Sequence, residues 1–108
     1  MTEGLIVLVT VGERSEADHI ARVLVEEKLA ACVGILPIES VYQWEGQWEN
    51  QVEFQLVIKT VKSRYPQVEA KVRQLHSYDV PEILALPVVA GSESYLRWVL
   101  QQTQPMTP

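Results

Sequence analysis

The sequence contains one cysteine, Cys32, among 108 residues, so an intrachain disulfide is impossible. It also lacks a long hydrophobic run, because the first apolar stretch extends only from Leu5 to Val9. Such a stretch is too short for a membrane span or a signal-peptide core, and Glu3 stands where a signal peptide would carry basic residues. We therefore expect a soluble, cytoplasmic protein that has no membrane partner.

Basic residues are scarce and scattered. The chain has 9 lysines and arginines against 14 aspartates and glutamates, which gives a formal net charge of −5. The nearest approach to a basic cluster is interrupted by Glu69, and its members fit the solvated face of a helix. These members are Lys62, Arg64, Lys71 and Arg73. We therefore expect no nucleic-acid partner.

Common enzyme motifs are absent as well. The sequence has no glycine-rich phosphate loop, no Gly-x-Ser-x-Gly turn and no His-Glu-x-x-His pair. Cys32 and a histidine could in principle form a nucleophilic pair, but Cys32 lies between Ala31 and Val33 and is typical of a small buried apolar residue. We therefore predict that the protein is not an enzyme and has no organic cofactor.

The sequence does contain enough apolar material for one core. Hydrophobic residues make up 47% of the chain, and its length suits a single domain over residues 1–108. No internal repeat or domain linker interrupts this pattern. The C-terminal tail has no apolar stripe, and we expect residues 1–4 and 102–108 to be frayed.

The first third of the chain predicts a strand followed by a helix. The nearly continuous apolar run over residues 5–11 is rich in β-branched side chains and is typical of a central strand buried on both faces. Ser15 and Asp18 then have the spacing of a capping box, and apolar residues recur after them at helical intervals. The pattern predicts an amphipathic helix that ends at about Leu29.

A long β-hairpin is expected over roughly residues 32–60. After a turn at residues 45–47, apolar and polar residues alternate from Val52 to Lys59, which is the clearest period-two signal in the chain. Pro37 marks a bend, a bulge or an edge position in the first strand of the hairpin, because proline cannot donate a hydrogen bond to a neighbouring strand.

The remaining segments predict two helices with a strand between them. Residues 63–76 are an expected helix with Pro66 in its first turn, where the missing amide costs little. Residues 82–89 are expected to form a last strand, which Pro81 and Pro87 confine to an edge or an irregular position, and a short third helix should open at Gly91-Ser92. The order β-α-β-β-α-β-α predicts an α+β fold of the ferredoxin-like, split βαβ type, with an antiparallel sheet and both main helices on one face.

Aromatic residues crowd the tip of the predicted hairpin, where Tyr42, Trp44 and Trp48 lie. A long two-stranded ribbon is only marginally stable in water, and exposed aromatic surface beside an open strand edge favours association. We therefore expect these three side chains to lie in the interface of a homo-oligomer. The alternative is that they fold back over their own sheet.

Polar groups concentrate between Leu75 and Ile83, where His76, Tyr78 and Glu82 lie close together in sequence. One interpretation is a metal or ligand site. The other is a helix end, where a charged histidine would favour the helix dipole, followed by ordinary entry into an edge strand. Spacing alone leaves both interpretations open.

A soft or borderline metal ion would use thiolate or imidazole ligands. Cys32 and His76 offer one of each, and Glu82 offers an oxygen ligand, but the fold or a neighbouring subunit must bring them together. Lys59, on the polar face of the strongest predicted strand, could meet an anion or could be an ordinary surface lysine.

Several motifs, taken in order, carry a resemblance to a known family. They are Leu-Ala-Ala-Cys-Val at 29–33, Ser-Val-Tyr-Gln-Trp-Glu-Gly at 40–46, Leu-Val-Ile-Lys-Thr at 56–60, His-Ser-Tyr-Asp-Val-Pro-Glu-Ile at 76–83, Ala-Leu-Pro-Val at 85–88 and Tyr-Leu-Arg-Trp at 95–98. Together they resemble the CutA family, the divalent-cation tolerance proteins. The resemblance extends from about Leu5 to Leu100.

The resemblance implies a ferredoxin-like subunit in a cytoplasmic homotrimer that contributes to tolerance of copper and other divalent cations. It implies copper(II) or another divalent cation as the bound ion. The resemblance places copper binding on Cys32 and His76, and Glu82 joins them as a candidate oxygen ligand.

The resemblance also implies a polar cleft between subunits, lined by Trp44, Lys59, Tyr78 and Glu82. The trimer resembles PII-type signalling trimers in shape, and those proteins bind small effectors in such clefts. The alternative function is therefore a PII-like sensor or scaffold that binds a small anion or metabolite.

Overall fold

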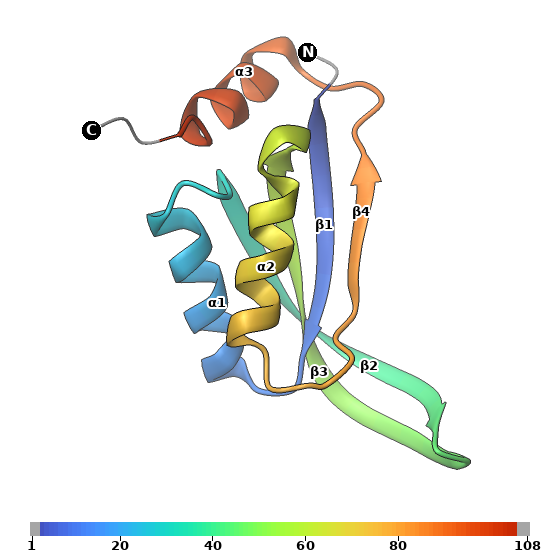
Figure 1. The fold of residues 1–108 in the computed structure, drawn as a ribbon. Helices are drawn as coiled ribbons and strands as arrows, with labels where there is room; N and C mark the ends of the chain where they lie inside the picture. Colours follow the sequence, from blue (N-terminus) through green and yellow to red (C-terminus); the bar gives the residue numbers. More distant parts are fainter. Residues whose placement is uncertain (1–2, 106–108) are drawn as a thin grey trace.

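The computed structural model describes residues 3–105, which form a four-stranded antiparallel sheet and three α-helices (Figure 1). The strands are β1 (Gly4–Val11), β2 (Cys32–Trp44), β3 (Gln47–Val61) and β4 (Ile83–Pro87). The helices are α1 (Arg14–Glu26), α2 (Tyr65–Leu75) and α3 (Glu93–Gln102), and a short 3-10 helix, Lys62–Arg64, precedes α2. The predicted α+β class and the predicted order of elements are confirmed. None of the helices in this described part is long and apolar enough to cross a membrane.

The sheet has the strand order β2-β3-β1-β4, so β1 and β3 are central and β2 and β4 are edges. β1 pairs antiparallel with both β3 and β4, and β2 pairs antiparallel with β3 along its whole length. The connection through α1 therefore joins β1 to β2 across β3, and the connection through α2 joins β3 to β4 across β1. The prolines around β4 correctly predicted that it is an edge strand.

The core lies between the sheet and helices α1 and α2, which cover the same face of the sheet (Figure 1). The apolar stripe of each helix packs against valine, leucine and isoleucine side chains of the central strands. The large, fully buried members are Val7, Val9, Val11, Ile20, Leu24, Leu56, Ile58, Val68 and Val72. At about 1.5–3 kcal/mol for each large apolar side chain removed from water, this layer is the main source of stability.

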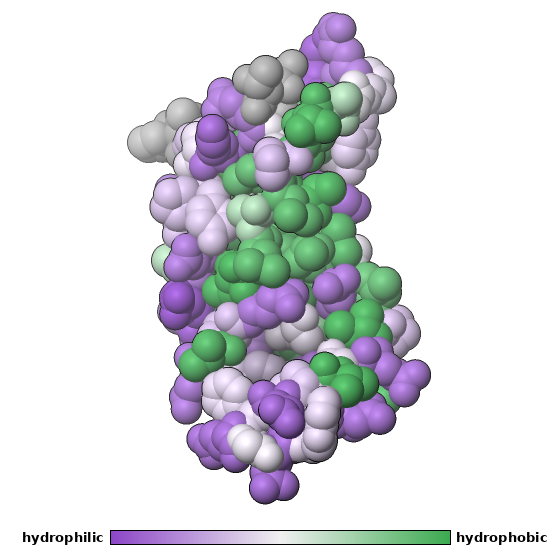
Figure 2. Space-filling view, turned by 90° about the vertical axis from the view of Figure 1, so that its right-hand side faces the viewer, coloured by the Kyte–Doolittle hydropathy of each residue, from purple (hydrophilic) through white to green (hydrophobic). Residues whose placement is uncertain are grey.

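Side chains that alternate with this core point to the opposite face of the sheet, where an apolar surface is open in the subunit. We call it the open sheet face; it comprises Ile6, Leu8, Leu36, Leu84 and Leu86. Leu84 and Leu86 are 55% and 47% exposed, and Figure 2 shows hydrophobic side chains gathered across the middle of the side on which β4 lies. A contiguous apolar surface of this kind is typical of an interaction site.

The predicted β-hairpin is confirmed, and its outer half projects beyond the rest of the sheet (Figure 1). β1 stops at Val11, opposite Phe54, while β2 and β3 continue to the turn at Glu45 and Gly46. Both turn residues have positive φ angles, 52° and 80°, as a two-residue hairpin turn that follows the strand twist requires.

The tryptophan side chains at the hairpin tip do not fold back over their own sheet. Trp44 and Trp48 are 51% and 73% exposed. The two tryptophans therefore do not cover their own sheet, whereas Tyr42 is half-buried, and the tip adds a second surface that favours association.

The predicted capping box of α1 is wrong. The N-cap is Glu13, whose side chain makes no capping hydrogen bond, so Ser15 lies inside the helix. Asp18 instead accepts a hydrogen bond from Arg14 Nε, at 3.0 Å, across one exposed helical turn. The acidic side chain thus supports the helix through an i,i+4 pair rather than through its terminus.

Three further elements differ in extent from the prediction. β4 covers only Ile83–Pro87 rather than residues 82–89. α1 ends at Glu26 rather than at Leu29, because Lys28 adopts a left-handed φ of 59° and the Leu29 amide donates back to the carbonyl of Leu24. α2 starts at Tyr65 rather than at residue 63, because the residues before it form the 3-10 turn.

Ordered structure extends further at both ends than the sequence predicts. Gly4 belongs to β1, and Gln102 belongs to α3. Thr103 is buried, and its hydroxyl donates to the carbonyl of Val99 at 2.9 Å. The remaining residues predicted to fray, 1–2 and 106–108, lie outside the described residues.

Candidate functional site

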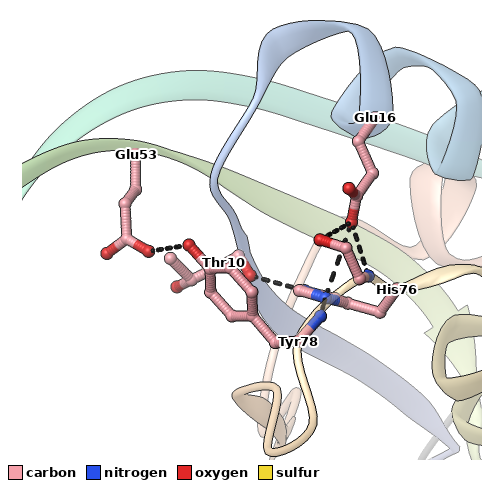
Figure 3. Close-up of polar contacts among 6 residues, drawn as sticks. Thr10, Glu16, Glu53, His76 and Tyr78 are labelled. Carbon is pink, nitrogen blue, oxygen red and sulfur yellow. Dashed lines mark hydrogen bonds and ion pairs between the residues drawn. The ribbon is translucent and has the colours of Figure 1, made fainter. Parts of the chain in front are cut away.

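His76 lies at the C-terminal end of α2, and its side chain is fully buried. Its Nε2 is 2.7 Å from the carbonyl oxygen of Thr10, which can only accept, so Nε2 carries the proton (Figure 3). Its Nδ1 accepts a hydrogen bond from the Tyr78 amide at 3.1 Å. The hydrogen bonds therefore assign a neutral imidazole in which both nitrogens are engaged.

Glu16 of α1 binds the loop that follows α2 (Figure 3). Its Oε2 accepts hydrogen bonds from the amide and the hydroxyl of Ser77, at 3.0 and 3.2 Å. The same oxygen is 3.5 Å from His76 Nδ1. The loop after α2 is thus held by β1 and by α1 at once.

Tyr78 continues this network to β3. Its hydroxyl donates to Glu53 Oε2 at 2.7 Å (Figure 3). Glu53 is only 3% exposed. Burial, and then the hydrogen bond and negative charge of Glu53, raise the pKa of Tyr78 well above its ordinary value. The phenol therefore stays protonated and remains a donor at neutral pH.

Gly12 makes room for this contact. A Cβ atom at position 12 would lie 2.7 Å from the Tyr78 hydroxyl oxygen, which is closer than real Cβ contacts allow. The glycine is therefore required by the close approach of a side chain from a loop far along the chain.

Thr10 joins the network to the start of β4. Its hydroxyl donates to Glu82 Oε2 at 3.2 Å, while its carbonyl accepts from His76. One residue of β1 thus positions both the buried imidazole and an exposed carboxylate.

These residues border a groove of about 740 Å³ between the outer hairpin and the loop after α2, which we call the acidic groove. It is lined by Thr10, Ser40, Val41, Tyr42, Trp44, Glu49, Gln51, Glu53, Tyr78, Asp79, Val80 and Glu82. The lining thus includes four carboxylates and three aromatic rings but no lysine, arginine or histidine. The ion pairs found among residues 3–105 involve none of these four carboxylates. The groove is therefore strongly negative and suits a cation.

Residues 5–102 match the model of a protein family described as CutA1 divalent ion tolerance protein. The chain belongs to the CutA1 family. The family assignment thus agrees with the resemblance carried by the sequence motifs, and it covers the whole sheet and its helices.

Named relatives and solved structures of the CutA1 family extend the match. The chain is 43% identical to the divalent-cation tolerance protein CutA of Thermus thermophilus over 91% of this chain and 96% of that protein. It is 46% identical to the chloroplastic CutA protein of Arabidopsis thaliana over 93% of this chain, but it spans only 56% of that relative's length. A structure of CutA from Archaeoglobus fulgidus, described as periplasmic, superposes with a TM-score of 0.91 at 37% identity, covering 94% of this chain and 99% of the other.

In this CutA1 chain, four of the residues predicted from the sequence come together. Tyr42, Trp44, Tyr78 and Glu82 all line the acidic groove. Lys59 does not line it, so one subunit does not bring together all four residues that were predicted to line the cleft. Within one subunit the groove lining has no basic residue, so its charge favours a cation.

The three predicted metal ligands do not meet inside the subunit. Cys32 pairs with Lys59 of β3, and Lys59 pairs in turn with Ile6 of β1. Ile6 is four residues, or about 13 Å along the strand, from Thr10, whose carbonyl binds His76. No three His, Cys, Asp or Glu side chains within residues 3–105 are placed to hold one metal ion. Cys32 is also only partly buried, which corrects the prediction that it is a core residue.

Sequence reasoning missed Glu53, Thr10 and Gly12. Glu53 follows the period-two pattern of the hairpin, which marks it as a solvated polar residue, and only its contact with a distant tyrosine makes it a buried carboxylate. Gly12 follows a strand and reads as an ordinary turn residue. No local signal in the sequence distinguishes them.

Proposed function

We propose that this chain acts without enzymatic chemistry in divalent-cation tolerance, by binding divalent cations, including copper(II), in the acidic groove. The observation that carries the proposal is a groove with four carboxylates and no basic side chain in a member of the CutA1 family. Its relatives in Thermus thermophilus and Archaeoglobus fulgidus are named divalent-cation tolerance proteins.

Carboxylate oxygens suit divalent cations, and copper(II) also accepts oxygen and nitrogen ligands. Glu82 is the best-placed ligand, because it is exposed and Thr10 orients one of its oxygens while the other can face the groove. His76 is less suitable, because both ring nitrogens are already engaged. One subunit would supply part of the coordination sphere, and water or another copy would supply the rest.

We also propose that the subunit, with its ferredoxin-like order of elements, assembles as a homotrimer. The open sheet face and the exposed tryptophans at the hairpin tip support association, since both are apolar and uncovered in the subunit. Assembly would also allow Lys59 or Cys32 of one copy to approach the acidic groove of another. A cytoplasmic location stays a prediction, because the names of relatives include both chloroplastic and periplasmic.

Calorimetric titration with copper(II) tests the proposal. Glu82→Gln should weaken binding about tenfold, because it removes a charged oxygen ligand, while Glu39→Gln, an exposed carboxylate outside the groove, should not change it. Equal affinities for both variants and the wild type would contradict a groove site. Weakening by Cys32→Ser alone would instead favour the predicted Cys32–His76 site formed between copies.

A growth test connects binding to tolerance. Cells that lack their own CutA1 protein should tolerate more copper when they express the wild-type chain than when they express Glu82→Gln at the same level. Equal protection by both would show that tolerance does not depend on the groove.

A further inference from the structure

Lys59 is an isolated charge on the open sheet face. Among the strand residues at the level of β1, it is the only charged one whose side chain points to this face, and its cross-strand neighbours are Cys32 and Ile6. Lys59 is half-buried and takes part in none of the ion pairs within residues 3–105. If a second copy covers this face, the ammonium group leaves water, and this is costly unless a carboxylate meets it.

Glu53 lies on the same face of β3, farther along toward the hairpin tip, and carries the opposite charge. The residue is 3% exposed, its Oε2 accepts from the neutral phenol of Tyr78, and no cation pairs with it in the part of the chain that the structure describes. Asp79 and Glu82, by contrast, are exposed, so water solvates their charges. Glu53 is therefore the groove carboxylate that gains most from a basic partner.

These two residues cannot pair within one subunit. Lys59 and Glu53 are six positions apart on β3, which is about 20 Å along an extended strand. The open sheet face thus has a positive charge at one end, and beyond Thr10 it continues into the acidic groove at the other. Copies that associate head to tail bring these two ends together, and because each copy offers one of each, such contacts can close into a ring.

We infer that Lys59 of one copy enters the acidic groove of the next copy and pairs there with Glu53. This inference rests on the proposed homotrimer and specifies a contact that holds it together. Each groove is then complete only in the assembly, since one copy supplies the carboxylates and its neighbour supplies the cation. Glu82, which is exposed and is not part of the pair, stays available for a metal ion.

A double-mutant cycle on the full-length protein tests the inference. Sedimentation in a fixed, sub-denaturing concentration of urea gives the protein concentration at which half of the trimers dissociate. Lys59→Met and Glu53→Gln should each raise this concentration about tenfold, because each leaves the opposite charge unpaired in the contact. The double variant should also raise it about tenfold, instead of the roughly hundredfold expected for independent losses. The distance between the two residues within one subunit assigns this coupling to neighbouring copies.

Two exposed charges outside the groove and the open sheet face provide matched controls. Lys62→Met and Glu39→Gln should each change the dissociation concentration less than about twofold. Circular dichroism identifies any variant that does not fold. Zero-length carbodiimide coupling of the wild-type protein then replaces the cycle, and mass spectrometry should find Lys59 joined to Glu53 of another chain.

Three results would overturn the inference: unchanged dissociation in both single variants, additive losses in the double variant, or absence of the Lys59–Glu53 link. A wild-type trimer that gives any of these results overturns this inference alone. A wild-type protein that is monomeric overturns the proposed homotrimer together with it.

Discussion

The contact between Gly12 and Tyr78 predicts that Gly12→Ala is destabilising, although the substitution stabilises a protein at positions where alanine fits the backbone without strain. The new Cβ atom would lie 2.7 Å from the Tyr78 hydroxyl oxygen, which must move. That oxygen donates to Glu53 at 2.7 Å, and the carboxylate has no other hydrogen-bond partner within residues 3–105. Alanine would therefore leave a buried charge without its donor.

The magnitude follows from two opposing effects. A hydrogen bond to a charged group contributes about 1.5–3 kcal/mol, and most of it is lost when the phenol is displaced. Replacing glycine by alanine restricts the unfolded chain and offsets about 0.4–1 kcal/mol of this loss. We expect the free energy of unfolding to fall by about 1–2 kcal/mol, which corresponds to a decrease in Tm of about 4–16 °C.

Urea unfolding at a fixed protein concentration measures this change. Gly34→Ala is the matched control, because its Cβ would meet only Val57 at 3.9 Å, an ordinary van der Waals contact. In a Tyr78→Phe background, Gly12→Ala should cost about 1 kcal/mol less, since the hydroxyl is gone. The reasoning is refuted if Gly12→Ala is as stable as Gly34→Ala, or if its cost is the same in both backgrounds.

Three further predictions follow from the site and the surfaces. His76→Ala should lower the free energy of unfolding, measured in urea, by about 2–4 kcal/mol, because it leaves two hydrogen-bond partners unpaired and opens a cavity. A loss below about 1 kcal/mol would contradict the buried network. Burial and a hydrogen bond to a carboxylate raise the pKa of Tyr78, so its contribution to stability is fully present below about pH 10 and is lost as the pH rises further. Urea unfolding between about pH 8 and 11 should show a shallower decline for Tyr78→Phe than for the wild type, and equal declines would count against the shift. Leu84→Asp, on the open sheet face, should reduce the oligomer mass measured by light scattering, whereas Val25→Asp, on α1, should not. An unchanged mass for both variants would exclude the open sheet face as the interface.

The fold could be predicted largely because its signals are local. The alternation from Val52 to Lys59 identified the hairpin, Pro66 marked the first turn of α2, and Ser92 caps α3 by accepting from the Tyr95 amide. The start of α1 could not be predicted in the same way. The capping-box pattern was present, but the backbone turns earlier, at Glu13.

The candidate site could be predicted only in part, for a similar reason. His76, Tyr78 and Glu82 stand close together in the sequence, so their concentration of polar groups is visible. Their partners are distant: Glu53 is 25 positions from the tyrosine, and Thr10 is 72 positions from the glutamate. Packing of the sheet creates these contacts, and no periodic pattern encodes them.

The unsupported outer half of the β2–β3 hairpin has a consequence for how association can be observed. Its pairs beyond Phe54 have no third strand, so their amides can open without unfolding the core. In a free subunit, hydrogen exchange near residues 41–50 would report local opening, while exchange in β1 would report global stability. Contacts between copies at the tip would remove this local opening and slow exchange there, whereas slower exchange in β1 would report the gain in global stability that association brings. Hydrogen exchange at the hairpin tip would therefore report self-assembly residue by residue.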